Sequence, residues 1–317
     1  MALILVTGGG GFIGSHIVER LLSEGHDVRV IDDFSTGRRE NLEFSPTSPR
    51  WGRLEVMPGD ITDMLAARRA VSGAEYVLHQ AAIPSVPRSV ADPAATNQAG
   101  VTGTLNMLIT SRDEGVKRFI YASSSSVYGD SETLPKVETM TPNPLSPYAV
   151  SKLAGELYAR AFHRLYGLPT IGLRYFNIFG PRQDPTAEYA AVIPKFITAI
   201  ARGERPVIFG DGGQTRDFNF ISNAVDANLC AMTCDAGAAG GSYNIACGQR
   251  ISLLDLVASV NAIFGTNLQA EHGDVRAGDV RHSLADISAA GEKLGYRPAV
   301  SFQEGLAQTA AWFRKKI

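Results

Sequence analysis

The sequence has little cysteine and no excess of charge of one sign. Only three of its 317 residues are cysteine, at positions 230, 234 and 247, an odd number too small for a disulfide framework. Its 30 basic and 32 acidic side chains leave a net charge of −2, which argues against a nucleic-acid-binding protein with a basic surface. We therefore expect a protein of a reducing compartment, with no nucleic-acid partner.

Long apolar runs and metal-binding clusters are also missing. The apolar segment 2–7 reaches glycines after a handful of residues and follows no basic segment, so it is too short for a signal peptide or a membrane span. Cys230 and Cys234 have no histidine near them in the sequence, and we interpret them as small core residues. These absences predict a cytoplasmic protein that needs neither a membrane nor a metal.

The pattern of the first half of the chain predicts alternating strands and helices. Strands are expected at 3–7, 27–31, 53–57, 75–79, 118–122 and 170–175, and helices at 12–23, 64–71, 94–114 and 148–166. This order predicts an α/β fold, a Rossmann doubly wound parallel sheet with a smaller C-terminal substrate-binding lobe. We place the first domain at 1–177 and the second at 178–317, with some later segments returning to the first.

A glycine-rich turn follows the first expected strand. Glycines at positions 8, 11 and 14 permit a tight turn, a close approach to a pyrophosphate and close helix packing, and the helix N-terminus offers N–H groups to phosphates. Asp32 ends the second strand about 20 residues later, where a carboxylate binds ribose hydroxyls and repels a 2′-phosphate. This pattern favours NAD, although Arg38 and Arg39 leave NADP open.

Tyr148 and Lys152 are four residues apart in an expected helix that Ser146 caps, so they share one face. An ammonium group beside a phenol lowers the phenol's pKa from about 10, which would make Tyr148 a general base. The serine run 123–126 follows the fifth strand, and a hydroxyl there could bind both a sugar oxygen and the tyrosine. An exposed helix pair and a polar turn are the plainer interpretations.

Taken together, these motifs resemble those of the extended short-chain dehydrogenase/reductases over essentially the whole chain. The glycine turn, the serines, Tyr148-x-x-x-Lys152 and the segment 174–177 occur in that family's order. Within it the chain is most similar to the UDP-hexose 4-epimerases, because the segments 60–61, 209–217 and 276–279 also fit their pattern.

The resemblance implies an NAD site, a catalytic set and a UDP-sugar site. The implied NAD residues are Gly8, Gly11, Phe12, Ile13, Gly14, Asp32, Asp33, Ser35, Thr36, Gly37, Asp60, Ile61, Gln80, Ala81, Ala82, Tyr148, Lys152 and Tyr175. The implied catalytic residues are Ser124, Tyr148 and Lys152. The implied substrate residues are Ser85, Ser123, Ser124, Asn177, Gln183, Ala191, Val192, Val207, Phe209, Arg216, Arg276, Asp279 and Ser283.

The reaction implied by the resemblance is redox-neutral. Tyr148 would take the proton of the sugar 4-hydroxyl while NAD⁺ receives hydride from C4, and the keto sugar would turn and accept the hydride on its other face. Ser125 and Ser126 stand where related dehydratases and decarboxylases have acidic residues, which argues against those reactions. Ser283 stands where glucose-restricted epimerases have tyrosine, which leaves room for an N-acetyl group. The segments 80–89 and 181–185 resemble those of bacterial UDP-N-acetylglucosamine 4-epimerases, except that Pro84 stands where these enzymes usually have glycine.

Several alternatives stay open at this stage. A 4-epimerase for UDP-glucuronate could use Arg88 or Arg281 for the substrate carboxylate. An oxidoreductase that releases reduced cofactor and a non-catalytic NAD-binding protein could share the fold, and Arg216 and Arg276 could form surface ion pairs with Asp217 and Asp279. The resemblance also implies a homodimer in which the helices 94–114 and 148–166 of two copies form a four-helix bundle.

Overall fold

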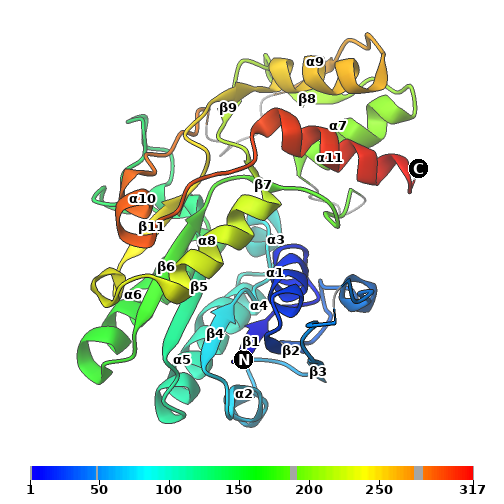
Figure 1. Cartoon of the computed structure of the whole chain (residues 1–317). Helices are drawn as coiled ribbons and strands as arrows, with labels where there is room; N and C mark the ends of the chain where they lie inside the picture. Colours follow the sequence, from blue (N-terminus) through cyan, green and yellow to red (C-terminus); the bar gives the residue numbers. More distant parts are fainter. Residues whose placement is uncertain (1, 48, 186–190, 275–280, 317) are drawn as a thin grey trace.

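A seven-stranded, fully parallel sheet forms the centre of the molecule (Figure 1). The computed structural model describes residues 2–47, 49–185, 191–274 and 281–316. The strand order is β11-β6-β5-β4-β1-β2-β3, so the order reverses between β1 and β4, where such sheets bind ligands. The strands are β1 (Leu3–Thr7), β2 (Asp27–Asp32), β3 (Leu54–Pro58), β4 (Tyr76–His79), β5 (Arg118–Ser124), β6 (Thr170–Tyr175) and β11 (Ser242–Ile245).

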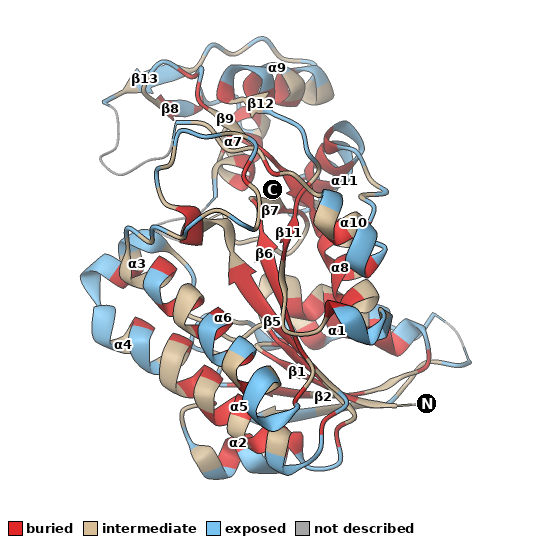
Figure 2. Ribbon diagram, turned by 90° about the vertical axis from the view of Figure 1, so that its left-hand side faces the viewer, coloured by how far each residue is buried: buried red, intermediate tan, exposed pale blue. Residues whose placement is uncertain are grey.

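Helices cover both faces of the sheet. Successive side chains of a strand point to opposite faces, and in the central strands the side chains on both faces are apolar, so both faces must be buried. From β1, Ile4 packs into the cluster that contains Leu21 of α1, whereas Leu5 packs with Met107 of α5 and Phe162 of α6. Figure 2 shows the sheet buried between these two layers. The helices around it are α1 (Phe12–Ser23), α2 (Met64–Val71), α3 (Val86–Ala91), α4 (Pro93–Asn97), the π-helix η2 (Gln98–Gly103), α5 (Thr104–Asp113), α6 (Pro147–Tyr166) and α8 (Ile221–Thr233).

A smaller lobe lies beyond the carboxyl ends of the strands, at the top of Figure 1. Phe179, Phe220 and Phe302 join it to the sheet region, with ring centroids 5.6 and 5.8 Å from that of Phe179. Its helices are α7 (Val192–Ala201), α9 (Leu253–Phe264) and α11 (Phe302–Arg314). Its short strands pair as β7 (Ile178–Phe179) with β10 (Asn219–Phe220), β8 (Val207–Phe209) with β13 (Glu271–Gly273), and β9 (Thr215–Arg216) with β12 (Ile251–Ser252).

The α/β fold expected from the sequence is confirmed, and the six expected strands lie within two residues of their predicted ends. The helix expected at 94–114 consists of α4, η2 and α5, because the π-helix interrupts it. Strand β11, from beyond residue 178, pairs with β6 at the edge of the main sheet, and no sequence pattern indicated this strand. The remaining helices are η1 (Arg39–Leu42), η3 (Ser125–Tyr128), η4 (Ala236–Ala238) and α10 (Ser288–Leu294). None of the described helices is long and apolar enough to cross a membrane.

Helix α6 approaches the sheet so closely that one position has no room for a side chain. A Cβ added at Gly155 would overlap the ring of Tyr121, which is fully buried in β5. We expect Gly155→Ala to lower the free energy of unfolding by about 1–3 kcal/mol, because the helix must move away from β5. Urea unfolding of the two proteins measures the difference.

Gly291 in α10 is the matched control, since it is also helical but a Cβ there meets only an ordinary contact at 3.6 Å. Gly291→Ala should be neutral or slightly stabilising, because alanine favours the helix. Equal effects at the two positions would show that the α6–β5 approach is not tight.

Candidate functional site: a cofactor cavity with a Ser-Tyr-Lys set

A cavity of about 860 Å³ opens at the carboxyl ends of the strands, where the strand order reverses between the neighbouring strands β1 and β4. All eighteen residues that the sequence assigned to NAD line this cavity, although they come from segments between Gly8 and Tyr175. Their convergence is a property of the sheet, because parallel strands bring their carboxyl ends to one edge.

No side chains cover the backbone of the glycines in the turn at the base of the cavity. Gly8 has a φ of +67°, and a Cβ there would lie 2.8 Å from the Cα of Ala81. A Cβ at Gly14 would overlap the carbonyl oxygen of Gly8. The N-cap residue Gly11 provides no side-chain cap, and the first turn of α1 holds no acid, so its N–H groups and partial positive charge are available to phosphates. These features fit a dinucleotide pyrophosphate.

Asp32 lies at the end of β2 and lines the cavity. Its two carboxylate oxygens each accept one backbone N–H, from Gly10 and Phe34, both at 2.8 Å. Burial raises the pKa of Asp32, and these two hydrogen bonds oppose the rise. Arg38 pairs with Asp184, and the Arg39 guanidinium lies 4.3 Å over the ring of Phe34. Both arginines that left NADP open therefore have partners within the protein.

The catalytic residues expected from the sequence meet at the same cavity. The Ser146 hydroxyl accepts the N–H of Ala149 at 3.1 Å and so starts α6, which carries Tyr148 and Lys152 on its cavity face. Ser124 does not appear among the lining residues, but it is hydrogen-bonded to the Tyr148 side chain from the end of β5. The Lys152 ammonium donates to the carbonyl of Ala122 at 2.7 Å.

The electrostatics of this set differ from the expectation. Burial raises the pKa of Tyr148 above its usual value of 10, and the hydrogen bond with Ser124 opposes the rise. Burial also lowers the pKa of Lys152 to about 8, and its Nζ lies 5.8 Å from the centre of the Tyr148 ring. The pKa of Tyr148 is therefore raised and not lowered as expected, because burial is the largest influence on it.

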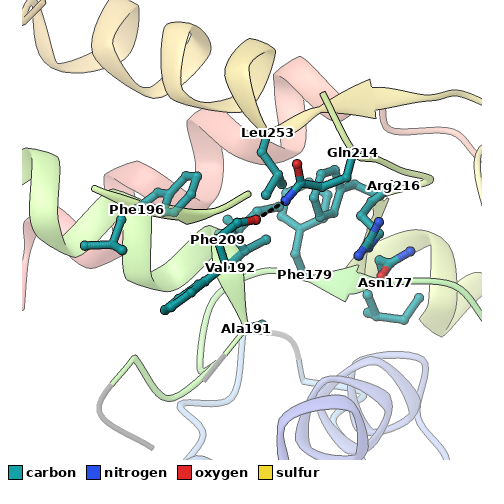
Figure 3. A pocket seen from close by; sticks show the side chains of 13 residues that line it. Asn177, Phe179, Ala191, Val192, Phe196, Phe209, Gln214, Arg216 and Leu253 are labelled. Atoms are coloured by element: carbon teal, nitrogen blue, oxygen red, sulfur yellow. Dashed lines mark hydrogen bonds between the residues drawn. The ribbon is translucent and has the colours of Figure 1, made fainter. Parts of the chain in front are cut away.

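A second cavity of about 270 Å³ lies in the smaller lobe (Figure 3). Figure 3 shows Asn177 and Arg216 together at its polar end, with Phe196 at the far, apolar end. Six of the residues assigned to the substrate line it, namely Asn177, Ala191, Val192, Val207, Phe209 and Arg216. Ala191 lines both cavities, so the two meet at this residue.

The other residues assigned to the substrate are placed less uniformly. Ser85, Ser123 and Gln183 line the larger cavity, and the buried Oε1 of Gln183 has no hydrogen-bond partner among the described residues. Ser283 lines neither cavity; its N–H donates to the carbonyl of Thr215 in β9 at 3.0 Å. Arg276 and Asp279 lie outside the described residues.

Asp217, the proposed surface partner of Arg216, is fully buried. Its carboxylate accepts the backbone N–H groups of Cys247, Gly248 and Ala285 at 3.0 to 3.2 Å. Among the described residues no cluster of His, Cys, Asp and Glu could hold a metal ion.

Sequence reasoning missed one wall of the larger cavity. Ala95, Gln98 and Ala99 line it from α4 and the π-helix η2, and Arg182 lines it from the segment after β7. The alanines and Arg182 carry no local signal, and the π-helix that contains Gln98 and Ala99 is not a pattern that the sequence indicated. A polar side chain within an otherwise regular helix was the only available indication.

The fold and the site define a class: an NAD-binding Rossmann enzyme with a Ser-Tyr-Lys set facing its cofactor cavity. The model of the NAD dependent epimerase/dehydratase family matches residues 4–246, and the chain belongs to this family. NAD is accordingly its cofactor.

Three similar proteins illustrate the range of the family. The UDP-glucose 4-epimerase of Mycolicibacterium smegmatis is 39% identical over 98% of both chains. The structure of UDP-N-acetylglucosamine 4-epimerase from Methanobrevibacter ruminantium, in complex with UDP-N-acetylmuramic acid, is 40% identical, with a TM-score of 0.93 over 100% of this chain and 99% of that one. The structure of UDP-glucose 4-epimerase from Thermotoga maritima with UDP-glucose is also 40% identical, with a TM-score of 0.92 over 99% of both chains.

The lowered pKa of Lys152 makes a prediction about stability and pH. Below pH 8 the amine is charged in both states, so folding carries the full cost of burying it; above about 10.5 it is neutral in both and the cost disappears. Lys152→Met never has this cost. The stability of this variant relative to the unsubstituted protein should therefore fall by about 2–3 kcal/mol between about pH 7 and about pH 10, measured by urea unfolding without NAD. A difference that does not change with pH would contradict the buried ammonium.

Proposed function

We propose that the protein is an NAD-dependent UDP-sugar 4-epimerase that interconverts UDP-N-acetylglucosamine and UDP-N-acetylgalactosamine, with UDP-glucose and UDP-galactose as further substrates. The enzyme is an isomerase. The observation that carries the proposal is the meeting at Ala191 of two cavities, one holding Tyr148 and Lys152 and the other holding Asn177 and Arg216. A sugar linked to a nucleotide diphosphate would occupy both.

In the reaction, Tyr148 accepts the proton of the sugar 4-hydroxyl. The Ser124 hydroxyl, which is hydrogen-bonded to Tyr148, also forms a hydrogen bond with that sugar oxygen and so orients it toward the phenol. Bound NAD⁺ supplies a reversible hydride acceptor for C4. Lys152 provides the nearby positive charge that favours the phenolate, which the raised pKa of Tyr148 makes necessary. Tyr148 then returns the proton, so the protein ends each turnover in its starting state.

Inversion requires the sugar to present its other face, so the protein must hold the substrate elsewhere. The smaller cavity suits this task, because the Arg216 guanidinium gives its polar end a positive charge that attracts phosphate oxygens, while Phe209 and Val192 give it apolar surface for a base. Affinity placed on the nucleotide leaves the sugar free to turn.

Two features support the N-acetylated sugar. The unpaired Oε1 of Gln183 needs an N–H or O–H donor, which an acetamido group can supply. Ser283, although it lines neither cavity, stands where the glucose-restricted epimerases that the chain resembles have a tyrosine. The structures of a UDP-N-acetylglucosamine 4-epimerase and of a UDP-glucose 4-epimerase are both 40% identical to this chain, so the proposal of the N-acetylated sugar rests on these residues and not on the resemblance.

The decisive experiment is to incubate the purified protein with UDP-N-acetylglucosamine, without added cofactor, and to follow the products by proton NMR. We expect UDP-N-acetylgalactosamine to appear, because a redox-neutral cycle keeps NAD bound. Conversion of UDP-glucose alone would keep the mechanism and contradict the acetamido assignment. No conversion of either sugar, even with added NAD, would contradict the proposed function.

Two variants serve as controls for this assay. Tyr148→Phe should lower kcat by about a hundredfold or more, since it removes the proton acceptor. Ser283→Tyr should lower kcat/KM for the N-acetylated sugar by about tenfold more than for UDP-glucose, because only the former has a bulky C2 group. An equal loss for both sugars would show that Ser283 does not contact C2.

A second candidate substrate is UDP-glucuronate, and Arg88 is the observation that favours it. Arg88 lines the larger cavity, and no hydrogen bond or ion pair of its guanidinium occurs among the described residues. Arg281, the other candidate for the carboxylate, instead pairs with Asp211 at 2.8 Å. Including UDP-glucuronate in the NMR assay decides between the substrates.

We also propose that two copies associate through α6. Val150, Leu157 and Leu165 are 51%, 53% and 73% exposed, and their spacing of seven and eight residues places them on one face of this helix. Helix α5 packs beside α6, so the pair could form a four-helix bundle with a second copy.

Leu157→Asp should convert a dimer into a monomer, because it puts a charge into the apolar seam; light scattering measures the mass. Leu65→Asp is the matched control, since Leu65 is 69% exposed on α2 and should not affect the mass. A monomeric unsubstituted protein, or a dimer that survives Leu157→Asp, would contradict this interface.

A further inference from the structure

His79 is a buried histidine that the proposed chemistry does not use. It ends β4 and is 1% exposed. Its ring stacks on Tyr121, with centroids 5.8 Å apart and an interplanar angle of 23°. Two threonine hydroxyls contact its ring nitrogens, Thr7 at Nδ1 and Thr104 at Nε2.

The positions of the hydrogens in this group follow from its contacts. The Thr104 hydroxyl donates its hydrogen to the carbonyl of Gly100 at 2.7 Å. Its oxygen is therefore the acceptor in the 3.0 Å contact with His79 Nε2. Nε2 therefore carries the ring hydrogen, and Nδ1 accepts the hydroxyl hydrogen of Thr7 at 2.8 Å. The Thr7 oxygen in turn accepts the N–H of Ala81 at 3.1 Å.

The ring stays neutral at any pH at which the enzyme would work. Burial, together with the charge of Lys152, lowers the pKa of His79 to about 3. A neutral ring has one donor and one acceptor, and both are used here. The result is an unbroken series of hydrogen bonds from Ala81 through Thr7, His79 and Thr104 to Gly100, which we call the His79 relay.

One end of the His79 relay sets the base of the cofactor cavity. Ala81 lines that cavity and is the residue that Gly8 approaches, with no room between them for a Cβ. The hydrogen bond from Ala81 to Thr7, the residue just before Gly8, therefore fixes the distance between the two NAD-binding turns.

The other end of the relay reaches the catalytic helix. Gly100 lies in the π-helix η2, whose Gln98 and Ala99 line the cavity. A Cβ at Gly100 would lie 2.8 Å from the hydroxyl of Ser151 in α6, between Tyr148 and Lys152. The stacked Tyr121 also donates its hydroxyl to the carbonyl of Lys152 at 3.3 Å.

We propose that His79 is a positioning residue that fixes the spacing between the two NAD-binding turns and helix α6, and thereby keeps NAD bound from one turnover to the next. The inference rests on the proposed function only in assuming that the cofactor is retained. It gives a role to the π-helix as well, since the relay holds that helix against α6.

The main test is His79→Phe, which keeps the stacked ring but leaves the hydroxyls of Thr7 and Thr104 without their partner. We expect the purified holoenzyme to release NAD about ten times faster, measured as free dinucleotide in the filtrate after dilution, without any sugar present. KM for the UDP-sugar should change by less than about twofold, because the smaller cavity is untouched.

Tyr243→Phe is the matched control. It removes one buried hydrogen bond, from Tyr243 to the carbonyl of Ala238 at 2.8 Å, on the edge strand β11 and outside both cavities. It should lower stability without changing the rate of NAD release. If His79→Phe loses stability as this control does but releases NAD at the unsubstituted rate, His79 only packs and the proposal is overturned.

Thr104→Val tests the relay even if His79→Phe fails to fold, because Thr104 does not line the cavity. It should speed NAD release in the same direction, and Thr104→Ser, which keeps the hydroxyl, should restore slow release. Fast release from both Thr104 variants, or from neither, would overturn the relay. Since no sugar is used, a failure of the proposed epimerase reaction would not change these results.

Discussion

The structure depends on one close approach, between the glycine turn after β1 and the end of β4. A side chain at Gly8 would collide with Ala81, and one at Gly14 would collide with the turn itself. The absence of these side chains lets the backbone of the turn reach the strand edge and aims the N-terminus of α1 into the cavity. The reversal of strand order at β1 and β4 opens the space that the turn then faces.

Burial governs the electrostatics around this approach. The same desolvation raises the pKa of Tyr148 and lowers those of Lys152 and His79. For His79 a neutral ring is the state that its two threonines require. For Tyr148 and Lys152, burial favours the neutral phenol and the neutral amine.

The smaller lobe and the sheet region share one apolar core. Phe179 and Phe220 pair through β7 and β10 and meet Phe302 of α11, so one apolar cluster runs from the sheet into the lobe. This arrangement holds the smaller cavity at a fixed place beside the larger one. In the function proposed above, a substrate that spans both cavities would be bound by its nucleotide in one and react in the other.

The sequence by itself determined the fold class and the six strands of the N-terminal sheet, because these follow from local patterns. The glycine turn, Asp32 and the Tyr-x-x-x-Lys pair of the cofactor cavity were also local signals, whereas the resemblance supplied most of its other residues and left out Ala95, Gln98, Ala99 and Arg182. Spacing of glycines, an acid after the second strand and a Tyr-x-x-x-Lys pair require no knowledge of distant contacts. Only the tertiary structure decided the place of β11, the small cavity with Arg216, and the His79 relay, which joins residues up to 97 positions apart along the chain. It also reversed the expected pKa of Tyr148. Burial is the physical reason, since the cost of desolvating a group depends on everything packed around it and not on its neighbours in sequence.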